Sequence, residues 1–253
     1  MATYKIIPLA LSKPFLIEPA ALYYKAYKGE LMGMIYGCFA LKNNETGEVI
    51  MVDTGLASQE DIAKYDYPFR RMEGAPNLKD VLADKGIDPS QVKTIIFTHL
   101  HQDQCFNLEL FPNASMYVQK VELQHAATPT KVEAKSYQKY DRPGLPAWAR
   151  AFGRLITIEG DRKLMDGIEI LFTPGHTPGS QTVVVDTEKG KYLLVGDNFY
   201  TMEQFTECRM NGNFTDLEGW YTSRDKVIRY MEEHGGQILC VHNPDIYSEE
   251  YYG

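Results

Sequence analysis

Histidines and aspartates of this chain gather at the ends of predicted strands, where their side chains could bind a metal ion. Residues 99–104 read His-Leu-His-Gln-Asp-Gln and follow an apolar, β-branched run at 92–97. The full set of such residues is His99, His101, Asp103, His176, Asp197 and His242. If neighbouring strands share a sheet, their ends converge at one edge, which is the usual position of a site in an α/β protein.

The residue types and their spacing favour metal binding. Positions 99, 101 and 103 alternate, so in an extended segment their side chains project to the same side. Imidazole and carboxylate are the nitrogen and oxygen ligands that zinc, iron and manganese accept. Each residue alone has an ordinary explanation, such as a hydrogen bond or turn chemistry, but together they predict a metal site. His125 in a predicted polar helix and His234 in the last turn of another are expected to be structural.

Apolar runs of strand length bring these residues to their places. Two strands are predicted at 34–42 and 48–52, joined by a turn. The run at 92–97 leads directly into His99, and the last strand, at 237–241, ends at His242. The other predicted strands lie near 115–119, 154–158, 168–172, 181–186 and 191–196.

Two helices have recognisable ends in the sequence. Asn77 is expected to cap a short helix that Gly86 ends. A long helix is expected over about 216–234, with Thr215 and Glu218 as a capping box. The strands come in two batches, each with helices, and this order predicts sheets covered by helices.

Composition narrows the classes of function. The chain has 253 residues without repeats or low-complexity linkers, so a single domain over 1–253 is expected. The net charge of −8 disfavours binding to nucleic acid or to an anionic membrane. No apolar run approaches the roughly 18 residues of a membrane span, and residues 1–15 lack the pattern of a secretory signal. The four cysteines are scattered without a CxxC pair, so a cytoplasmic location is expected.

Five motifs resemble the metallo-β-lactamase superfamily in order and spacing, from about residue 34 onward. They are Val52-Asp53-Thr54-Gly55, Thr98-His99-Leu100-His101-Gln102-Asp103, Thr173-Pro174-Gly175-His176-Thr177-Pro178-Gly179-Ser180, Gly196-Asp197 and Val241-His242. The resemblance implies an α/β fold, an αββα sandwich of two mixed sheets packed face to face with helices on the outer faces. Within the superfamily the chain is most similar to the N-acyl homoserine lactone lactonases, which are quorum-quenching hydrolases, because Tyr200 stands three residues after Asp197.

The same resemblance implies how metal ions would be held. A first site would comprise His99, His101 and His176. A second would comprise Asp103, Gln104 and His242, and Asp197 would bridge the two. Asp53 would support the metal-binding loop without touching the metal. The expected cofactor is zinc, as one or two ions, with manganese or iron as alternatives.

The chain departs from the family at position 104. The family pattern is His-x-His-x-Asp-His, whereas this chain has Gln104 where the second site expects an imidazole. An amide oxygen is a weaker zinc ligand than imidazole and suits harder cations better. Three interpretations stay open: the second metal is weak or absent, Gln104 ligates through its oxygen, or Cys105 turns in as a thiolate. A filled first site and a weaker second one are favoured.

The activity implied is hydrolysis of a lactone or a related small-molecule ester. A metal at the three histidines would lower the pKa of its water to about 7. Asp103 would orient the hydroxide and accept its proton, and Tyr200 would stabilise the oxyanion. With the second metal weakened, the alkoxide needs Tyr200 or an acidic leaving group, which favours an aromatic or otherwise activated lactone. The predicted long loops at 61–76 and 128–150 would line the pocket with Tyr67, Phe69, Tyr137, Tyr140 and Trp148.

Other functions stay open at this point. A mononuclear iron dioxygenase, similar to the persulfide dioxygenases, would tolerate a defective second site, although Tyr200 argues against it. A non-catalytic binding protein would take up no metal under any loading. Among other hydrolases of the superfamily, a thioesterase remains possible, whereas the acidic balance argues against a nuclease and the missing export signal against a β-lactamase. A monomer or a homodimer is expected.

Overall fold

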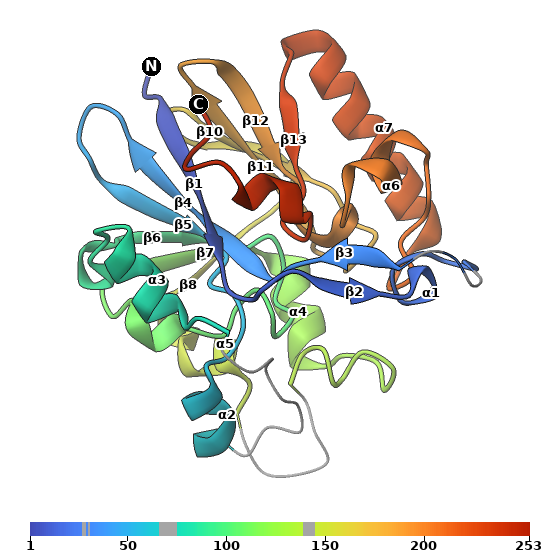
Figure 1. The fold of residues 1–253 in the computed structure, drawn as a ribbon, viewed down its shortest axis with the longest axis horizontal. Helices are drawn as coiled ribbons and strands as arrows, with labels where there is room; N and C mark the ends of the chain where they lie inside the picture. The colour runs from blue at the N-terminus through green and yellow to red at the C-terminus, as the bar shows by residue number, and fades with distance from the viewer. Residues whose placement is uncertain (27–28, 30, 66–74, 139–144) are drawn as a thin grey trace.

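Two large mixed sheets packed face to face form the centre of the molecule (Figure 1). The structure is a computed structural model that describes residues 1–26, 29, 31–65, 75–138 and 145–253. Helices cover the outer face of each sheet, so the αββα sandwich implied by the sequence motifs is confirmed.

The first sheet has six strands in the order β1-β4-β5-β6-β7-β8. From β5 to β8 neighbouring strands run parallel, whereas β1, β4 and β5 are antiparallel to one another in turn. The carboxyl ends of β5 to β8 therefore lie at one edge. The strands span Tyr4–Ala10 (β1), Gly37–Asn43 (β4), Val49–Val52 (β5), Thr94–Ile96 (β6), Ser115–Gln119 (β7) and Leu155–Ile158 (β8).

The second sheet has five strands in the order β13-β12-β11-β10-β9. Strand β12 is parallel to β13 and antiparallel to β11, which is in turn antiparallel to β10. Strands β10, β12 and β13 thus run in the same direction and end at the same edge. The strands span Arg162–Met165 (β9), Ile168–Phe172 (β10), Gln181–Thr187 (β11), Gly190–Leu194 (β12) and Gln237–Leu239 (β13).

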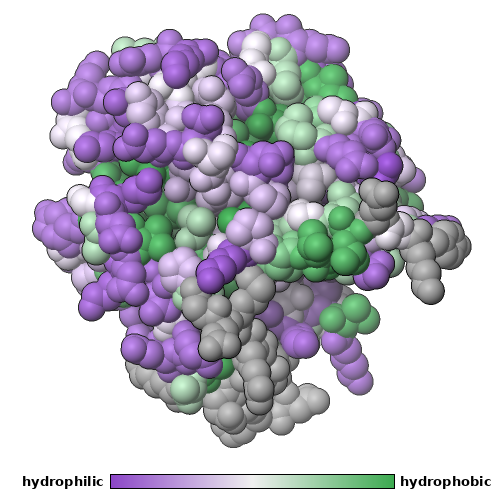
Figure 2. Space-filling view, viewed as in Figure 1, coloured by the Kyte–Doolittle hydropathy of each residue, from purple (hydrophilic) through white to green (hydrophobic). Residues whose placement is uncertain are grey.

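Helices lie on both outer faces, and a small hairpin lies beside the sheets (Figure 1). The hairpin pairs β2 (Phe15–Ile17) with β3 (Met32–Met34), and Figure 2 shows apolar side chains over it, where Leu16 is 67% and Leu31 50% exposed. The helices are α1 (Pro19–Leu22), α2 (Gln59–Tyr65), α3 (Leu78–Asp84), α4 (Lys120–Ala127), α5 (Ala147–Arg150), α6 (Met202–Thr206) and α7 (Leu217–His234). None of the described helices is long and apolar enough to cross a membrane.

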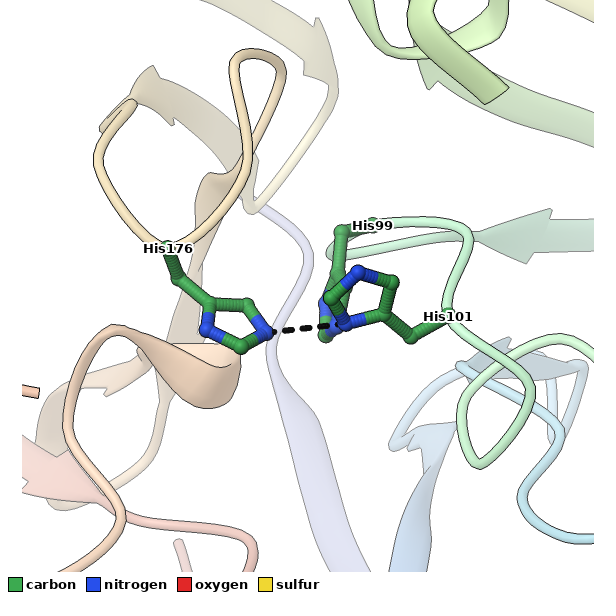
Figure 3. Close-up of side chains that lie close together, drawn as sticks. All are labelled: His99, His101 and His176. Carbon is green, nitrogen blue, oxygen red and sulfur yellow. Dashed lines mark hydrogen bonds between the residues drawn. The ribbon is translucent and has the colours of Figure 1, made fainter. Parts of the chain in front are cut away.

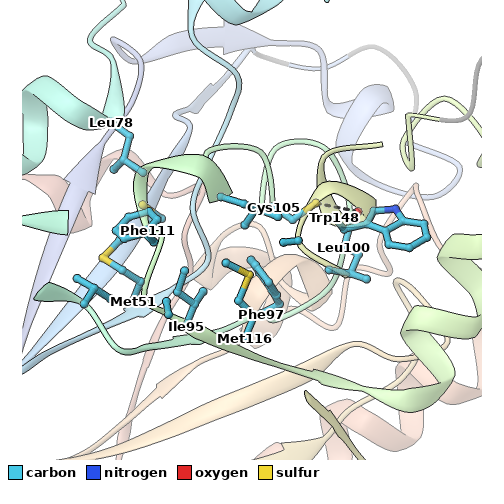
Figure 4. Packing of buried hydrophobic residues seen from close by; sticks show 14 of the residues in the cluster. Met51, Leu78, Ile95, Phe97, Leu100, Cys105, Phe111, Met116 and Trp148 are labelled. Carbon is cyan, nitrogen blue, oxygen red and sulfur yellow. Dashed lines mark hydrogen bonds between the residues drawn. The ribbon is translucent and has the colours of Figure 1, made fainter. Parts of the chain in front are cut away.

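Alternating strand residues divide the core into layers. Along β11, Val183 and Val185 face the opposite sheet, whereas Val184 packs under α7 beside Trp220 and Val227. A third cluster lies between the first sheet and α3 (Figure 4). Its members include Met51, Leu78, Ile95, Phe97, Phe111 and Met116. Because the strands are held on both faces, the loops that leave their ends start from fixed positions.

Several local expectations were wrong. Asn77 precedes α3, but its side chain makes no capping hydrogen bond. Helix α7 follows Asp216, and Thr215 does not form the predicted capping box, because its hydroxyl donates to the Gly175 carbonyl oxygen instead. The strand expected at 191–196 ends at Leu194. The stretches 61–76 and 128–150, expected to be irregular, contain the end of α2 and all of α5.

The loop before His176 should tolerate no side chain at Gly175. The φ angle of Gly175 is +146°, and a Cβ atom there would lie 2.5 Å from the Cα atom of Trp220. We expect Gly175→Ala to lower the free energy of unfolding by about 2–4 kcal/mol, through backbone strain and displacement of α7.

Gly86→Ala is the matched control for this change. Gly86 also has a positive φ, +67°, but nothing lies within 4 Å of the added carbon. Its cost should stay near 1 kcal/mol, from the left-handed backbone alone. Urea unfolding of both variants measures the difference, and equal losses would contradict the role given to the contact with α7.

Candidate metal centre

All the histidines and aspartates predicted to bind metal meet at the shared edge of the two sheets. His99 follows β6 in the first sheet, and the turn after it holds Asp103 and Gln104. The second sheet contributes three residues, each after a strand that ends at that edge. These are His176 after β10, Asp197 after β12 and His242 after β13.

Three imidazole rings form one cluster. Figure 3 shows the rings of His99, His101 and His176 pointing toward one another. Nδ1 of His101 lies 3.0 Å from Nε2 of His176. One ligand atom from each of the three residues lies within 4.8 Å of the others. This arrangement matches a three-histidine metal site that leaves a further position open.

A second cluster joins the first through Asp197. It comprises Asp103, Asp197 and His242, whose ligand atoms also lie within 4.8 Å of one another. Oδ2 of Asp197 faces the first cluster, 3.6 Å from Nε2 of His176 and 3.8 Å from Nε2 of His99. Oδ1 of Asp197 faces the second, 3.0 Å from Nε2 of His242. The two oxygens of one carboxylate therefore serve different clusters.

Hydrogen bonds set the tautomer of His99. The carboxylate of Asp53 accepts from the Thr98 backbone N–H and from the Thr98 hydroxyl, each at 2.8 Å. Because the hydroxyl proton is given to Asp53, the Thr98 oxygen accepts from Nδ1–H of His99, at 3.1 Å. The lone pair of His99 is thus on Nε2, which is buried and has no hydrogen-bond partner among the described residues. A metal ion is the partner that such a nitrogen fits.

Backbone carbonyls set the tautomers of two more histidines. Nδ1 of His176 donates to the Asn213 carbonyl oxygen at 2.7 Å, and Nδ1 of His242 donates to that of Ile35 at 2.8 Å. In both residues Nε2 is left to face Asp197. The donor set at the three histidines therefore fits a metal such as zinc.

Electrostatics separate the two clusters. Burial lowers the pKa of His99 to about 3, so that ring is neutral near pH 7 and can ligate without losing a proton. Burial also lowers the pKa of His242, but the charge of Asp197 and the hydrogen bond to it outweigh burial and raise it to about 9. A metal that binds Nε2 of His242 would have to displace that proton, whereas a metal that binds Nε2 of His99 would displace none.

Gln104 turns its amide nitrogen toward the second cluster, while its oxygen Oε1 is buried without a hydrogen-bond partner among the described residues. Its side chain is fully buried, and the amide nitrogen Nε2 donates to Oδ1 of Asp197 at 3.0 Å. An amide N–H has no lone pair to offer a cation. Cys105 does not replace it, because its thiol donates to the Leu100 carbonyl oxygen at 3.3 Å and packs in the core cluster (Figure 4). The interpretation of Cys105 as a ligand was wrong.

Comparison with known proteins identifies the family. The model of the metallo-beta-lactamase superfamily matches residues 38–230. The chain belongs to this superfamily.

Relatives within the superfamily agree with this assignment. N-acyl homoserine lactonase AttM of Rhizobium radiobacter is 31% identical over 175 residues, which make up 67% of this chain. The matched part spans 65% of the length of that relative. Among solved structures, a quorum-quenching N-acyl homoserine lactone lactonase superposes with a TM-score of 0.78 at 23% identity, over 100% of this chain and 99% of that one. AidC, a dizinc quorum-quenching lactonase, gives 0.71 at 17% identity, over 96% and 91%.

Two tyrosines lie beside the histidine and aspartate clusters. The ring centroid of Tyr200 lies 5.5 Å from that of His242 and 6.1 Å from that of His176, so Tyr200 adjoins both clusters. Burial raises the pKa of Tyr200 well above 10, and the phenol keeps its proton. Tyr36, which the sequence motifs did not indicate, packs against His242 at 5.5 Å.

A buried glutamate that sequence reasoning missed joins the two histidine loops. Oε1 of Glu122 accepts from the Leu100 N–H and from the Tyr137 hydroxyl, both at 2.9 Å, while Oε2 accepts from the Gly179 N–H at 3.0 Å. One carboxylate thus ties the loop of His99 and His101 to the loop that follows His176. No local motif marks Glu122, because its partners are distant in the sequence.

The aromatic pocket predicted in the loops is not found as expected. Tyr137 is fully buried, with its ring centroid 4.6 Å from that of His101, so it packs against the loop that holds His101. Trp148 belongs to the core cluster. For these two residues the predicted pocket lining was wrong, and Tyr67, Phe69 and Tyr140 lie outside the described residues.

The two remaining histidines lie outside both clusters. Nε2 of His125 lies 3.1 Å from Oε2 of Glu133, and Nδ1 of His234 lies 3.1 Å from the Tyr230 carbonyl oxygen. Both contacts agree with the structural roles expected of them.

Asp53 should control metal affinity through the tautomer of His99. In Asp53→Asn the new NH₂ group faces one of the two Thr98 donors, and the hydroxyl can turn its proton toward Nδ1 of His99. That would place the ring proton on Nε2 and block ligation. Asn accepts the φ of +61° at this position, so the backbone should hold.

We expect zinc affinity to fall about 10–100-fold in Asp53→Asn, measured by competition with a chromogenic chelator. Asp88→Asn is the control, because Asp88 is an acidic residue whose carboxylate caps an exposed turn. Unchanged affinity in Asp53→Asn would mean that the Thr98 hydroxyl does not set the tautomer.

Changing Glu122 should lower the free energy of unfolding more than removing any one of the groups that donate to it. Glu122→Gln keeps the shape but turns an NH₂ group toward the Leu100 or the Gly179 N–H, which leaves buried donors unpaired. We expect a loss of about 2–4 kcal/mol. Tyr137→Phe removes a single donor and should cost about 1 kcal/mol. Thermal unfolding of both metal-free variants tests the order, and a Glu122→Gln loss no larger than that of Tyr137→Phe would contradict it.

Proposed function

We propose that this chain is a metal-dependent hydrolase that opens lactones or cleaves related small-molecule esters. The observation that carries the proposal is the buried set of His99, His101 and His176, whose nitrogens converge beside Asp197. We assign the metal to these three residues, with Oδ2 of Asp197 as a further ligand. Zinc is the metal proposed, because imidazole and carboxylate suit it and AidC is a dizinc lactonase.

The substrate class follows from the relatives and from the site together. AttM, the relative at 31% identity, is an N-acyl homoserine lactonase. A lactone needs a nucleophile for its carbonyl carbon, donors for the oxyanion and a proton for the departing oxygen. The described residues offer a candidate for each task.

Asp103 is the candidate to hold the proton of the attacking water. Its side chain is 19% exposed, whereas those of Asp197 and His242 are 5% and 1% exposed, so the site opens at Asp103. Its Oδ2 lies 3.8 Å from Nε2 of His242, which holds the carboxylate in place. A zinc ion, when bound, supplies the Lewis acidity that brings the pKa of such a water to about 7.

Tyr200 is the candidate donor to the substrate oxygens. Its protonated phenol packs between His176 and His242, the two histidines contributed by the second sheet. A neutral phenol can donate a hydrogen bond to the oxyanion and then to the ring oxygen that leaves, and that oxygen takes the proton that Asp103 removed from the water. Because the Gln104 nitrogen offers no lone pair to a second metal ion, we assign the hydrogen bond to that leaving oxygen to Tyr200. Lactones with an acidic leaving group, such as an aryl lactone, should therefore open most readily.

The test is a lactone panel with variants at both residues. Zinc-loaded protein should hydrolyse an aryl lactone faster than an alkyl N-acyl homoserine lactone. Asp103→Asn should lower kcat about 10²–10⁴-fold for both substrates. Tyr200→Phe should lower kcat about 10–100-fold for the alkyl lactone and less for the aryl one, because a phenolate needs less help to leave.

Tyr221→Phe is the matched control for Tyr200→Phe. Tyr221 is a tyrosine on α7 that is 40% exposed, so losing its hydroxyl should leave both rates unchanged. If zinc-loaded protein opens neither type of lactone nor any ester, the proposed function is wrong. An equal effect of Tyr200→Phe on both substrates would instead remove Tyr200 from leaving-group departure.

A further inference from the structure

We propose that the amide of Gln104 replaces the second metal ion of this family, so that the chain binds one metal per molecule. The inference rests on the proposed function in placing the first metal at His99, His101 and His176. It concerns the other side of Asp197, where the family pattern would put a second histidine-bound cation.

The amide nitrogen of Gln104 lies where a ligand atom of the second site would lie. It is 3.0 Å from Oδ1 of Asp197 and 3.5 Å from Nε2 of His242. Two ligands of one zinc ion are separated by roughly these distances, because each bond is about 2.0–2.2 Å long. The nitrogen carries hydrogens in place of a lone pair, so it satisfies the carboxylate by donating to it.

Turning the amide over does not restore a good site by itself. Its oxygen would then lie 3.0 Å from Oδ1 of Asp197, with two acceptors facing each other and no proton between them. An imidazole at this position differs in that its nitrogen can change from donor to ligand in place by losing a proton, whereas the amide must rotate to present its oxygen. For Gln104 to bind a cation, the amide must therefore both give up its hydrogen bond to Asp197 and rotate.

The second cluster has few other ligands to offer. The metal-ligating group found there among the described residues consists of Asp103, Asp197 and His242, and Asp197 is shared with the first site. The thiol of Cys105 is turned away toward the Leu100 carbonyl oxygen. With Oδ1 of Asp197 held by Gln104, two ligands remain that the first site does not use, too few for a tight zinc site.

The amide also gives the two carboxylate oxygens of Asp197 different partners. Its Oδ1 accepts from Gln104, while its Oδ2 stays 3.6 Å from Nε2 of His176 and 3.8 Å from Nε2 of His99. The hydrogen bond thereby fixes the carboxylate plane with one oxygen aimed at the three-histidine site. Gln104 acts here as a positioning residue for the single metal.

Metal content decides the proposal. The whole chain and its variants are loaded with excess zinc, and separately with excess manganese, then freed of unbound ions and measured by elemental analysis. The parent should retain one equivalent of either metal. Gln104→His and Gln104→Glu, which add a ligand lone pair or a charge, should retain two. Gln104→Met removes the donor without adding a strong ligand and should retain one.

Two retained equivalents in the parent, with zinc or with manganese, would overturn the proposal. So would a parent that retains none, because one bound ion is required. The parent tests the number of metals. Folded Gln104→His and Gln104→Glu that both still retain one equivalent would overturn the role given to the amide.

Cobalt(II) gives a second readout that does not depend on activity. In Gln104→His two cobalt ions bridged by Asp197 should couple magnetically, and the paramagnetic resonance signal per cobalt should fall. The parent should give the full signal of isolated ions. A parent with a coupled signal would overturn the inference.

The outcome is separable from that of the proposed function. A parent that holds one metal but opens no lactone or ester would leave this inference standing and remove the proposed activity. A parent that holds two metals and opens lactones would support the proposed activity and overturn the inference about Gln104.

Discussion

A buried carboxylate surrounded by imidazole nitrogens is the constraint on which the rest of this structure depends. Asp197 is 5% exposed and lies within 4 Å of Nε2 of His99, His176 and His242. Negative charge and lone pairs cannot be gathered in a closed space unless positive charge or hydrogen-bond donors join them. The first cluster meets this need with the metal ion that we propose. The second meets it with the donors of Gln104 and His242.

The fold makes this gathering possible by the directions of its strands. Strands β10, β12 and β13 end at the edge where β6 also ends, so residues from four distant segments reach one place. Hydrogen bonds then orient these side chains. Asp53 acts on His99 through Thr98, and the carbonyl oxygens of Asn213 and Ile35 hold His176 and His242. Glu122 joins the two histidine loops. Rigid strands supply position, and these buried partners supply orientation.

The residues of the two clusters could be brought together from sequence because the segments that hold them follow strands that are apolar enough to recognise. Other elements lacked such a signal. Strand β1 contains Pro8, which is tolerated because β1 is an edge strand of its sheet. Strand β9, also at an edge, is short and basic. Glu122 carries no signal in the sequence, because its partners Leu100 and Gly179 are distant along the chain and meet its carboxylate only in the folded protein.

X-ray absorption spectroscopy of the zinc-loaded chain tests the central claim most directly, because it reports the neighbours of the metal itself. The first shell should contain three imidazole nitrogens at about 2.0–2.1 Å with oxygen ligands beside them. No sulfur should occur near 2.3 Å, and no second metal at about 3.5–4 Å. A metal neighbour at that distance would contradict a single ion paired with Gln104, and fewer than three imidazoles would contradict the site itself.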